Sequence, residues 1–154
     1  NAHMSVDELD TLFNKRSGMM GLTGFGDLRE VHRLVEEGNE DAKLALDIYV
    51  HRIVGYIGNY TAQMGGVDVI TFTAGVGEND DVVRKMVCDK LAPFGVKLDE
   101  EKNATRSKEP RIISTPDSAV TICVIPTNEE LAIARKSAAI AEEGKDSYGN
   151  VFSK

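Results

Sequence analysis

The sequence contains few of the residues that mark secreted, membrane-bound or disulfide-stabilised proteins. It has no tryptophan and only two cysteines. Cys88 and Cys123 each stand between apolar neighbours, which favours buried, reduced thiols over a disulfide. No apolar run approaches the length of a membrane span, and no signal peptide is recognisable. We therefore expect a cytoplasmic protein without a membrane partner.

Positive charge is also scarce. Lys and Arg together number 18 against 25 Asp and Glu, which gives a net charge of -7. Proteins that bind nucleic acids gain affinity mainly from Lys and Arg on phosphates, so this balance argues against a nucleic-acid partner. No arrangement of His and Cys resembles a metal cluster or a nucleophile pair. His32 and His51 lie within helical patterns, where ordinary packing is the expected role.

The length of 154 residues, 42% of them hydrophobic, is that of one domain with a real core. Residues 1–4 read as an expression scar outside the fold. We expect residues 5–144 to form the folded part, as an incomplete nucleotide-binding domain, and residues 145–154 to form a polar tail.

Hydrophobic periodicity and capping signals predict alternating helices and strands. Helices are expected over residues 5–16, 27–37, 39–64, 79–91 and 127–144, strands over 67–73, 96–98, 111–114 and 119–125, and a glycine-rich loop over 21–26. This alternation predicts an α/β layer with a parallel sheet. The strand at 67–73 is short, apolar and rich in β-branched residues, as expected of a central strand.

Three of the predicted helices carry more specific expectations. Thr127 is expected to cap the last helix, with Glu130 completing a capping box. The helix at 79–91 should turn its apolar residues inward, and these are Val82, Val83, Met86 and Val87. The long helix at 39–64 is apolar on more than one stripe. Both sheet packing with a subunit contact and burial within one chain would explain that pattern.

The most informative stretch is the one where the apolar run 67–72 stops at Gly75, Val76 and Gly77. The polar residues Glu78 and Asn79 then open a helix. A strand, a glycine turn and a helix start are how α/β proteins hold phosphate, because glycine lets the backbone approach an anion. The spacing matches neither the Rossmann nor the Walker pattern. A tight turn that binds nothing is therefore the alternative.

Three segments, at residues 18–29, 72–79 and 124–130, occur in an order that resembles the acetate kinase (acetokinase) family. The segments at 42–46, 64–68 and 113–115 match the same pattern. The resemblance covers nearly the whole chain and concerns the C-terminal portion of that family. It implies the actin, Hsp70 and sugar-kinase-like (ribonuclease H-like) fold, here with few parallel strands packed by helices. The family's catalytic asparagine, aspartate, histidines and transition-state arginines have no counterpart in this sequence.

The resemblance also implies which residues bind nucleotide. Gly75, Val76, Gly77, Glu78 and Asn79 match the family's nucleotide loop. A second nucleotide-contacting segment is matched by Asp27, Leu28 and Arg29, although residues 24–27 are one residue shorter than the common form. Arg29 would stack on adenine or lie near the ribose; the alternative is a cation on a helix face.

Glu129 matches the family's magnesium-binding glutamate. A carboxylate near ATP phosphates suits Mg²⁺, which prefers hard oxygen ligands. The alternative is an acidic residue that the dipole of the last helix favours in its first turn.

The implied parent reaction is reversible phosphoryl transfer from ATP to acetate, with Mg²⁺ as cofactor, ATP or ADP as ligand and the acetate site largely outside this chain. The rival interpretations are a propionate kinase fragment, a non-catalytic module for dimerisation or nucleotide binding, and a plain α/β domain. Because the family dimerises through its C-terminal domains, the resemblance predicts a homodimer or higher oligomer, with the long helix at 39–64 as the expected contact.

Overall fold

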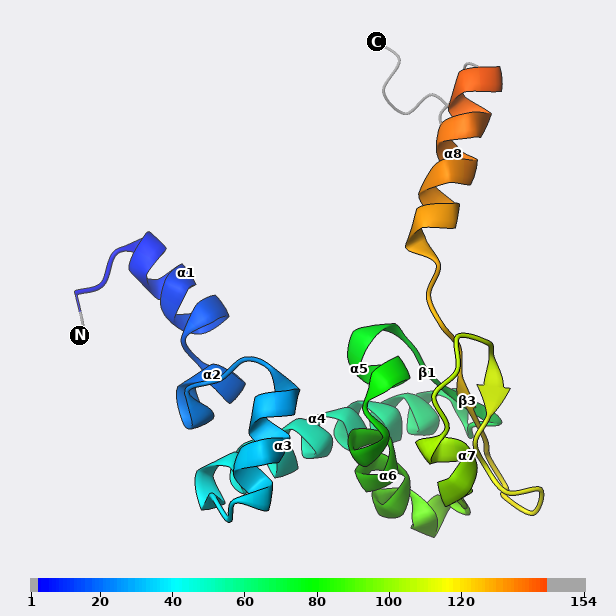
Figure 1. Cartoon of the computed structure of the whole chain (residues 1–154), viewed down its shortest axis with the longest axis horizontal. Coiled ribbons are helices and arrows are strands. Elements are labelled where there is room, and N and C mark those ends of the chain that lie inside the picture. The colour runs from blue at the N-terminus through cyan, green and yellow to red at the C-terminus, as the bar shows by residue number, and fades with distance from the viewer. Residues whose placement is uncertain (1–2, 144–154) are drawn as a thin grey trace.

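The computed structural model describes residues 3–143, so the predicted polar tail at 145–154 lies outside the described residues. Eight α-helices, one 3₁₀ turn and three strands follow one another within that range (Figure 1). They are α1 (Val6–Lys15), α2 (Gly18–Thr23), α3 (Leu28–Glu36), α4 (Glu40–Met64), β1 (Val69–Phe72), α5 (Ala74–Asn79), α6 (Asp81–Lys90), η1 (Ala92–Phe94), α7 (Glu100–Ala104), β2 (Arg111–Ile112), β3 (Thr121–Val124) and α8 (Glu129–Glu143).

The sheet has the order β1-β3-β2, with β1 parallel and β2 antiparallel to β3. The expected α/β class with a parallel strand pair is confirmed; the strand expected at 119–125 is central, whereas the strand expected at 67–73 lies at an edge of the described sheet. β3 is central and carries the fully buried Ile122 and Val124, whereas β1 pairs only with β3 and leaves Val69 52% exposed. The strand expected at 96–98 is reduced to a single bridge between Leu98 and Ser114.

The core lies where α4 and α6 pack against one another and against the sheet. Its buried residues include Val50 of α4, Val87 of α6 and Ile122 of β3, all at 0% exposure. Helices α2 and α3 pack on the N-terminal part of α4. Several apolar side chains of α4 are exposed in the described part of the chain, namely Leu44, Ile48, Tyr56, Tyr60 and Met64.

Helix boundaries follow local capping chemistry, in most places as expected. Ser5 forms a capping box with Glu8, and Asn39 accepts a hydrogen bond from the Ala42 amide. The loop expected at 21–26 is wrong in its first half, because residues 18–23 form the helix α2. That helix ends at Gly24, whose φ of +77° is the left-handed conformation that glycine adopts without strain.

The two terminal helices project from the body of the molecule (Figure 1). Helix α1 has no buried residue, and Phe13 is 67% exposed. In α8, Ile133 is 65% exposed. No helix among the described residues is long and apolar enough to cross a membrane. Both cysteines are free thiols, as expected, with Cys88 buried and Cys123 partly buried.

Candidate functional site

A cleft of about 620 Å³ lies between the start of α3 and the α5–α6 segment. Its lining residues are Asp27, Leu28, Arg29, His32, Gly75, Val76, Asn79, Asp80, Asp81, Val82 and Arg106. The volume is that of a small-molecule site. The structure thus brings together two sequence-predicted segments, 27–29 and 75–79, that are far apart in the chain. Of the second segment, Gly77 and Glu78 do not line this cleft.

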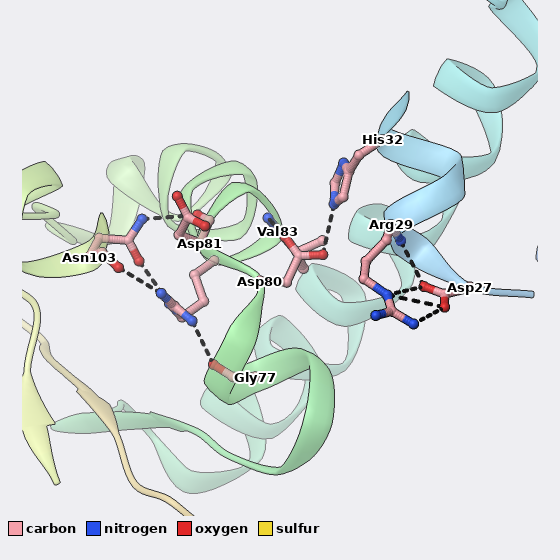
Figure 2. Close-up of polar contacts among 9 residues, drawn as sticks. Asp27, Arg29, His32, Gly77, Asp80, Asp81, Val83 and Asn103 are labelled. Atoms are coloured by element: carbon pink, nitrogen blue, oxygen red, sulfur yellow. Dashed lines mark hydrogen bonds and ion pairs between the residues drawn. The ribbon is translucent and has the colours of Figure 1, made fainter. Parts of the chain in front are cut away.

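The α3 wall is organised by Asp27, which is the N-cap of that helix. One carboxylate oxygen accepts a hydrogen bond from the Arg29 amide at 2.9 Å, and the carboxylate also pairs with the Arg29 guanidinium at 2.5 Å (Figure 2). The side-chain hydrogen bond from Arg29 and its amide together lower the pKa of Asp27 to about 2. Arg29 is therefore folded back on its own helix start, with a side chain that is 89% exposed.

The α5 wall differs from the expected glycine turn. The helix starts at Ala74 rather than at Glu78, so the glycines lie inside its first turns. Ala74 adopts φ +58°, a conformation that costs a residue with a Cβ about 1–2 kcal/mol. A break at Asp80 separates α5 from α6, so the helix expected over 79–91 is confirmed but begins two residues later, at Asp81.

The two glycines of α5 have different surroundings. A Cβ on Gly75 would meet nothing within 4 Å, and this residue lines the cleft. A Cβ on Gly77 would lie 3.1 Å from the Phe72 carbonyl carbon, which is tighter than nine in ten real Cβ contacts. Gly77 therefore lets α5 pack on the end of β1, whereas Gly75 faces the cleft.

A hydrogen bond joins the two walls of the cleft. The Nε2 atom of His32 on α3 lies 2.7 Å from a carboxylate oxygen of Asp80, and the other oxygen accepts from the Val83 amide at the start of α6 (Figure 2). Both side chains are largely buried, at 21% and 12% exposure. The His32–Asp80 contact sets the position of α3 relative to the α5–α6 junction.

A buried arginine supports α5 from the side away from solvent. Arg84 on α6 is 2% exposed, and its Nη1 atom donates to the carbonyls of Gly77 and Glu78, each at 3.0 Å. Its Nε and Nη2 atoms donate to the side chain and the carbonyl of Asn103, each at 2.7 Å. Asn103 in turn donates to the Asp81 carbonyl at 2.9 Å (Figure 2). This Arg84 network ties α5, α6 and α7 into one unit.

Glu78 contacts the last predicted segment instead of the cleft. Its carboxylate accepts hydrogen bonds from the Thr127 amide at 2.8 Å and the Thr127 hydroxyl at 3.1 Å. The hydrogen bond that the Thr127 amide donates is the main reason that the pKa of Glu78 is lowered. A second cavity lies beside Glu78, and Thr127 and Asn128 also line it. Asn79 lines both this cavity and the first cleft, so the two spaces adjoin at Asn79.

The expected capping box at the start of α8 is wrong. Asn128 is the capping residue, because its Oδ1 accepts from the Leu131 amide at 3.0 Å, while Thr127 is engaged by Glu78. Glu129 is the first residue of α8, and both it and Glu130 are exposed. Within residues 3–143, no group of three or more His, Cys, Asp and Glu side chains gathers as a metal site.

Six contributors to the site escaped the sequence reasoning: His32, Asp80, Asp81, Arg84, Asn103 and Arg106. One signal was available for Arg84, since it interrupts the buried face formed by Val83, Val87 and Cys88. Val82 was expected to point inward, but it is 47% exposed and lines the cleft.

Comparison with known proteins gives consistent matches. A family model described as the acetokinase family matches residues 1–135. The acetate kinase of Leifsonia xyli subsp. xyli is 54% identical over 136 residues, which are 88% of this chain and 34% of that protein. This chain therefore spans about a third of the length of the curated relatives it matches.

Solved structures agree with the sequence matches. The crystal structure of Porphyromonas gingivalis acetate kinase matches with a TM-score of 0.80 and 41% identity, over 90% of this chain and 35% of that one. A propionate kinase from Francisella tularensis subsp. tularensis matches with a TM-score of 0.78 and 39% identity, over 88% and 34%. These likenesses confirm the expected actin, Hsp70 and sugar-kinase-like fold class.

Proposed function

This chain belongs to the acetokinase family, and from that membership we propose that it supplies the nucleotide-binding part of an acetate kinase. Such an enzyme transfers the γ-phosphoryl group of ATP reversibly to acetate and produces acetyl phosphate. The observation that carries the proposal is the convergence of segments 27–29 and 75–79 on one cleft. The acetate site and the catalytic constellation belong, in this proposal, to the parts of the relatives that this chain does not span.

The chemistry of the lining suits a nucleoside. Leu28, Val76 and Val82 give the cleft an apolar part, and Val82 is 47% exposed. A flat base placed there would cover apolar surface, which is favourable by about 25 cal/mol per Å². Polar groups of Asp27 and Asn79 lie on the same lining, within reach of ribose hydroxyls. The cleft would hold adenosine between α3 and the α5–α6 junction.

The proposed metal ligand is Glu129. Mg²⁺ is commonly held by one or two carboxylates together with substrate phosphates and waters, so a full protein cage is not required. The Glu129 carboxylate is exposed and follows Asn128, which lines the space that adjoins the cleft at Asn79. One free carboxylate at that place fits the requirement. When bound, Mg²⁺ would neutralise phosphate charge; the residues of this chain would bind and orient the nucleotide.

Phosphoryl transfer depends mainly on positioning and on neutralising charge. This chain would position the nucleotide and its metal but would lack the acetate site and the catalytic constellation, so we expect no acetate kinase turnover from the isolated 154 residues. A hydroxamate assay for acetyl phosphate measures this directly. Turnover at the rate of an ordinary kinase, in a preparation free of contaminating enzyme, would show that the catalytic residues are present in this chain.

Propionate is the second candidate acceptor, and the likeness to the Francisella propionate kinase favours it. The curated relatives named acetate kinase favour acetate. A full-length kinase that carries this segment distinguishes the two through its kcat/KM for each acid. A higher value for propionate would overturn the choice of acetate.

Isothermal titration of this chain with ADP, with and without Mg²⁺, tests nucleotide binding itself. Two matched variants locate the site: Gly75→Ala adds a methyl group in the cleft, and Gly58→Ala adds one in α4 away from it. Neither Cβ would meet an atom within 4 Å. We expect Gly75→Ala to weaken ADP binding about tenfold, as overpacking does, and Gly58→Ala to leave it unchanged. Absence of binding to the unmodified chain would favour a non-nucleotide module.

A further inference from the structure

Building on the proposed function, we propose that Arg106 is an anion-binding residue of the cleft and contacts a phosphate of the bound nucleotide. None of the resemblance-derived residues that line the cleft offers an unpaired cationic side chain, because those residues are acidic, neutral or, in the case of Arg29, already paired. The inference deepens the proposed function by naming a further binding residue in the same site.

The charges around the cleft single out Arg106. Asp27 neutralises Arg29, the other arginine of the lining. Among the described residues, neither a hydrogen bond nor an ion pair engages the guanidinium of Arg106, although the carboxylates of Asp80 and Asp81 line the same cleft. An exposed guanidinium beside a cleft is well suited to phosphate, because its planar set of donors can bind two oxygens at once.

The backbone that carries Arg106 is held in place from its N-terminal side. Asn103, three residues earlier, is 4% exposed and is bonded to Arg84 and to the Asp81 carbonyl. The Thr105 hydroxyl donates to the Glu101 carbonyl at 2.9 Å, which closes the end of α7. These hydrogen bonds therefore fix the position at which the chain leaves α7 and continues to Arg106.

The same network fixes the glycine segment on the other side. Arg84 donates to the carbonyls of Gly77 and Glu78 at the end of α5 and to Asn103 at α7. The positions of Arg106 and of Gly75 are consequently set by one buried guanidinium. Such preorganisation reduces the entropy lost when a ligand binds.

Lys108 provides a matched control. It is a cation two residues further on and exposed like Arg106, but it lines the adjoining space beyond Asn79 and not the cleft. If positive charge anywhere in this segment attracted ADP, removal of either Arg106 or Lys108 would lower the affinity for ADP. If Arg106 contacts a phosphate directly, only its removal would lower the affinity for ADP.

The experiment measures the affinity of this chain for ADP and for adenosine by calorimetry, in the presence of Mg²⁺. Arg106→Ala, Arg106→Lys and Lys108→Ala are compared with the unmodified chain. We expect Arg106→Ala to weaken ADP binding by about tenfold to a hundredfold, the effect of losing one or two charge-assisted hydrogen bonds. Adenosine affinity should stay unchanged, Arg106→Lys should be intermediate, and Lys108→Ala should match the unmodified chain.

Two results would overturn the inference while leaving the proposed function intact. One is ADP binding by Arg106→Ala that equals that of the unmodified chain. The other is an equal loss for ADP and adenosine, which would place Arg106 against the nucleoside. Failure of the unmodified chain to bind either ligand would instead overturn the proposed function. Thermal midpoints within a degree of the unmodified chain verify folding, because among the described residues Arg106 makes no hydrogen bond or ion pair that its removal would break.

Discussion

Replacement of the buried Arg84 by methionine tests whether the network beneath the cleft holds the fold together. The change keeps most of the side-chain volume and removes all four hydrogen bonds that the guanidinium donates. The carbonyls of Gly77, Glu78 and Asn103 then lose a donor in a place where Arg84 itself is 2% exposed. Water has little access to this place, so it would not readily replace the lost donor.

The magnitude follows from the number of acceptors left behind. A buried polar group without a partner costs about 1–3 kcal/mol. The losses are not additive, and burial already opposes the charge, as the lowered pKa of Arg84 shows. Breaking a buried charged network in other proteins costs about 3–5 kcal/mol, which is the loss of unfolding free energy we expect here. For a chain of this size each kcal/mol shifts the thermal midpoint by about 2–4 °C.

Thermal and urea unfolding followed by circular dichroism measure the loss. Arg135→Met serves as the control, because it makes the same substitution on the exposed helix α8. We expect a fall of roughly 6–20 °C in the thermal midpoint for Arg84→Met and a change near zero for the control. Equal midpoints for the two variants would refute the reasoning, since the carbonyls at the end of α5 would then need no donor from Arg84.

Three further outcomes are expected. Gly77→Ala should lower the free energy of unfolding by about 1–3 kcal/mol, because the new Cβ meets the Phe72 backbone; unchanged urea unfolding would contradict this. Asn128→Ala should fray α8, a cap loss of about 1 kcal/mol, whereas Glu130→Ala should not, and hydrogen exchange of the first turn compares them. Burial raises the pKa of Cys88 to about 11. In a Cys123→Ser variant, iodoacetamide at pH 8 should therefore label Cys88 only after denaturation. Rapid labelling of the folded chain would show an accessible thiolate.

The same thiol gives a direction for stability at high pH. The pKa of Cys88 is raised from 9.0 to about 11 in the folded chain, so between these values the unfolded state has lost a proton that the folded state keeps. The folded state binds more protons in that window, and stability falls as pH rises through it. Comparison of the unmodified chain with Cys88→Ala isolates this contribution, because the alanine variant should lose less stability between pH 9 and 11.

Local signals were sufficient to predict most of the secondary structure. Capping residues such as Ser5 and Asn39 act within four residues of their targets, so their helices were placed within one or two residues of the structure. The errors lie where a distant partner decides. Thr127 has the local pattern of a cap, yet Glu78, which lies far away in the sequence, takes its amide and hydroxyl.

The candidate site was predictable in its segments but not in its supports. The resemblance pointed to residues 27–29 and 75–79, and these do line one cleft, apart from Gly77 and Glu78. His32 and Arg84 act through partners on other elements, and although the position of Arg84 on a buried helix face hints at its burial, nothing in the sequence identifies those partners. Gly75 and Gly77 cannot be told apart from the sequence either: Gly75 faces the cleft, whereas Gly77 packs against β1.

The parallel pairing of β1 with β3 has a consequence for the order of folding. Val69 pairs with Thr121, so this contact closes a long loop of chain, and such non-local pairings slow folding because the loop's entropy is lost before the contact forms. Helix α5, helix α6 and Arg106 all lie inside that loop. The wall of the cleft opposite α3 therefore takes shape late, whereas α4 relies on local contacts and can form early. A ligand of the cleft would therefore find its complete site only in molecules in which β1 and β3 have already paired.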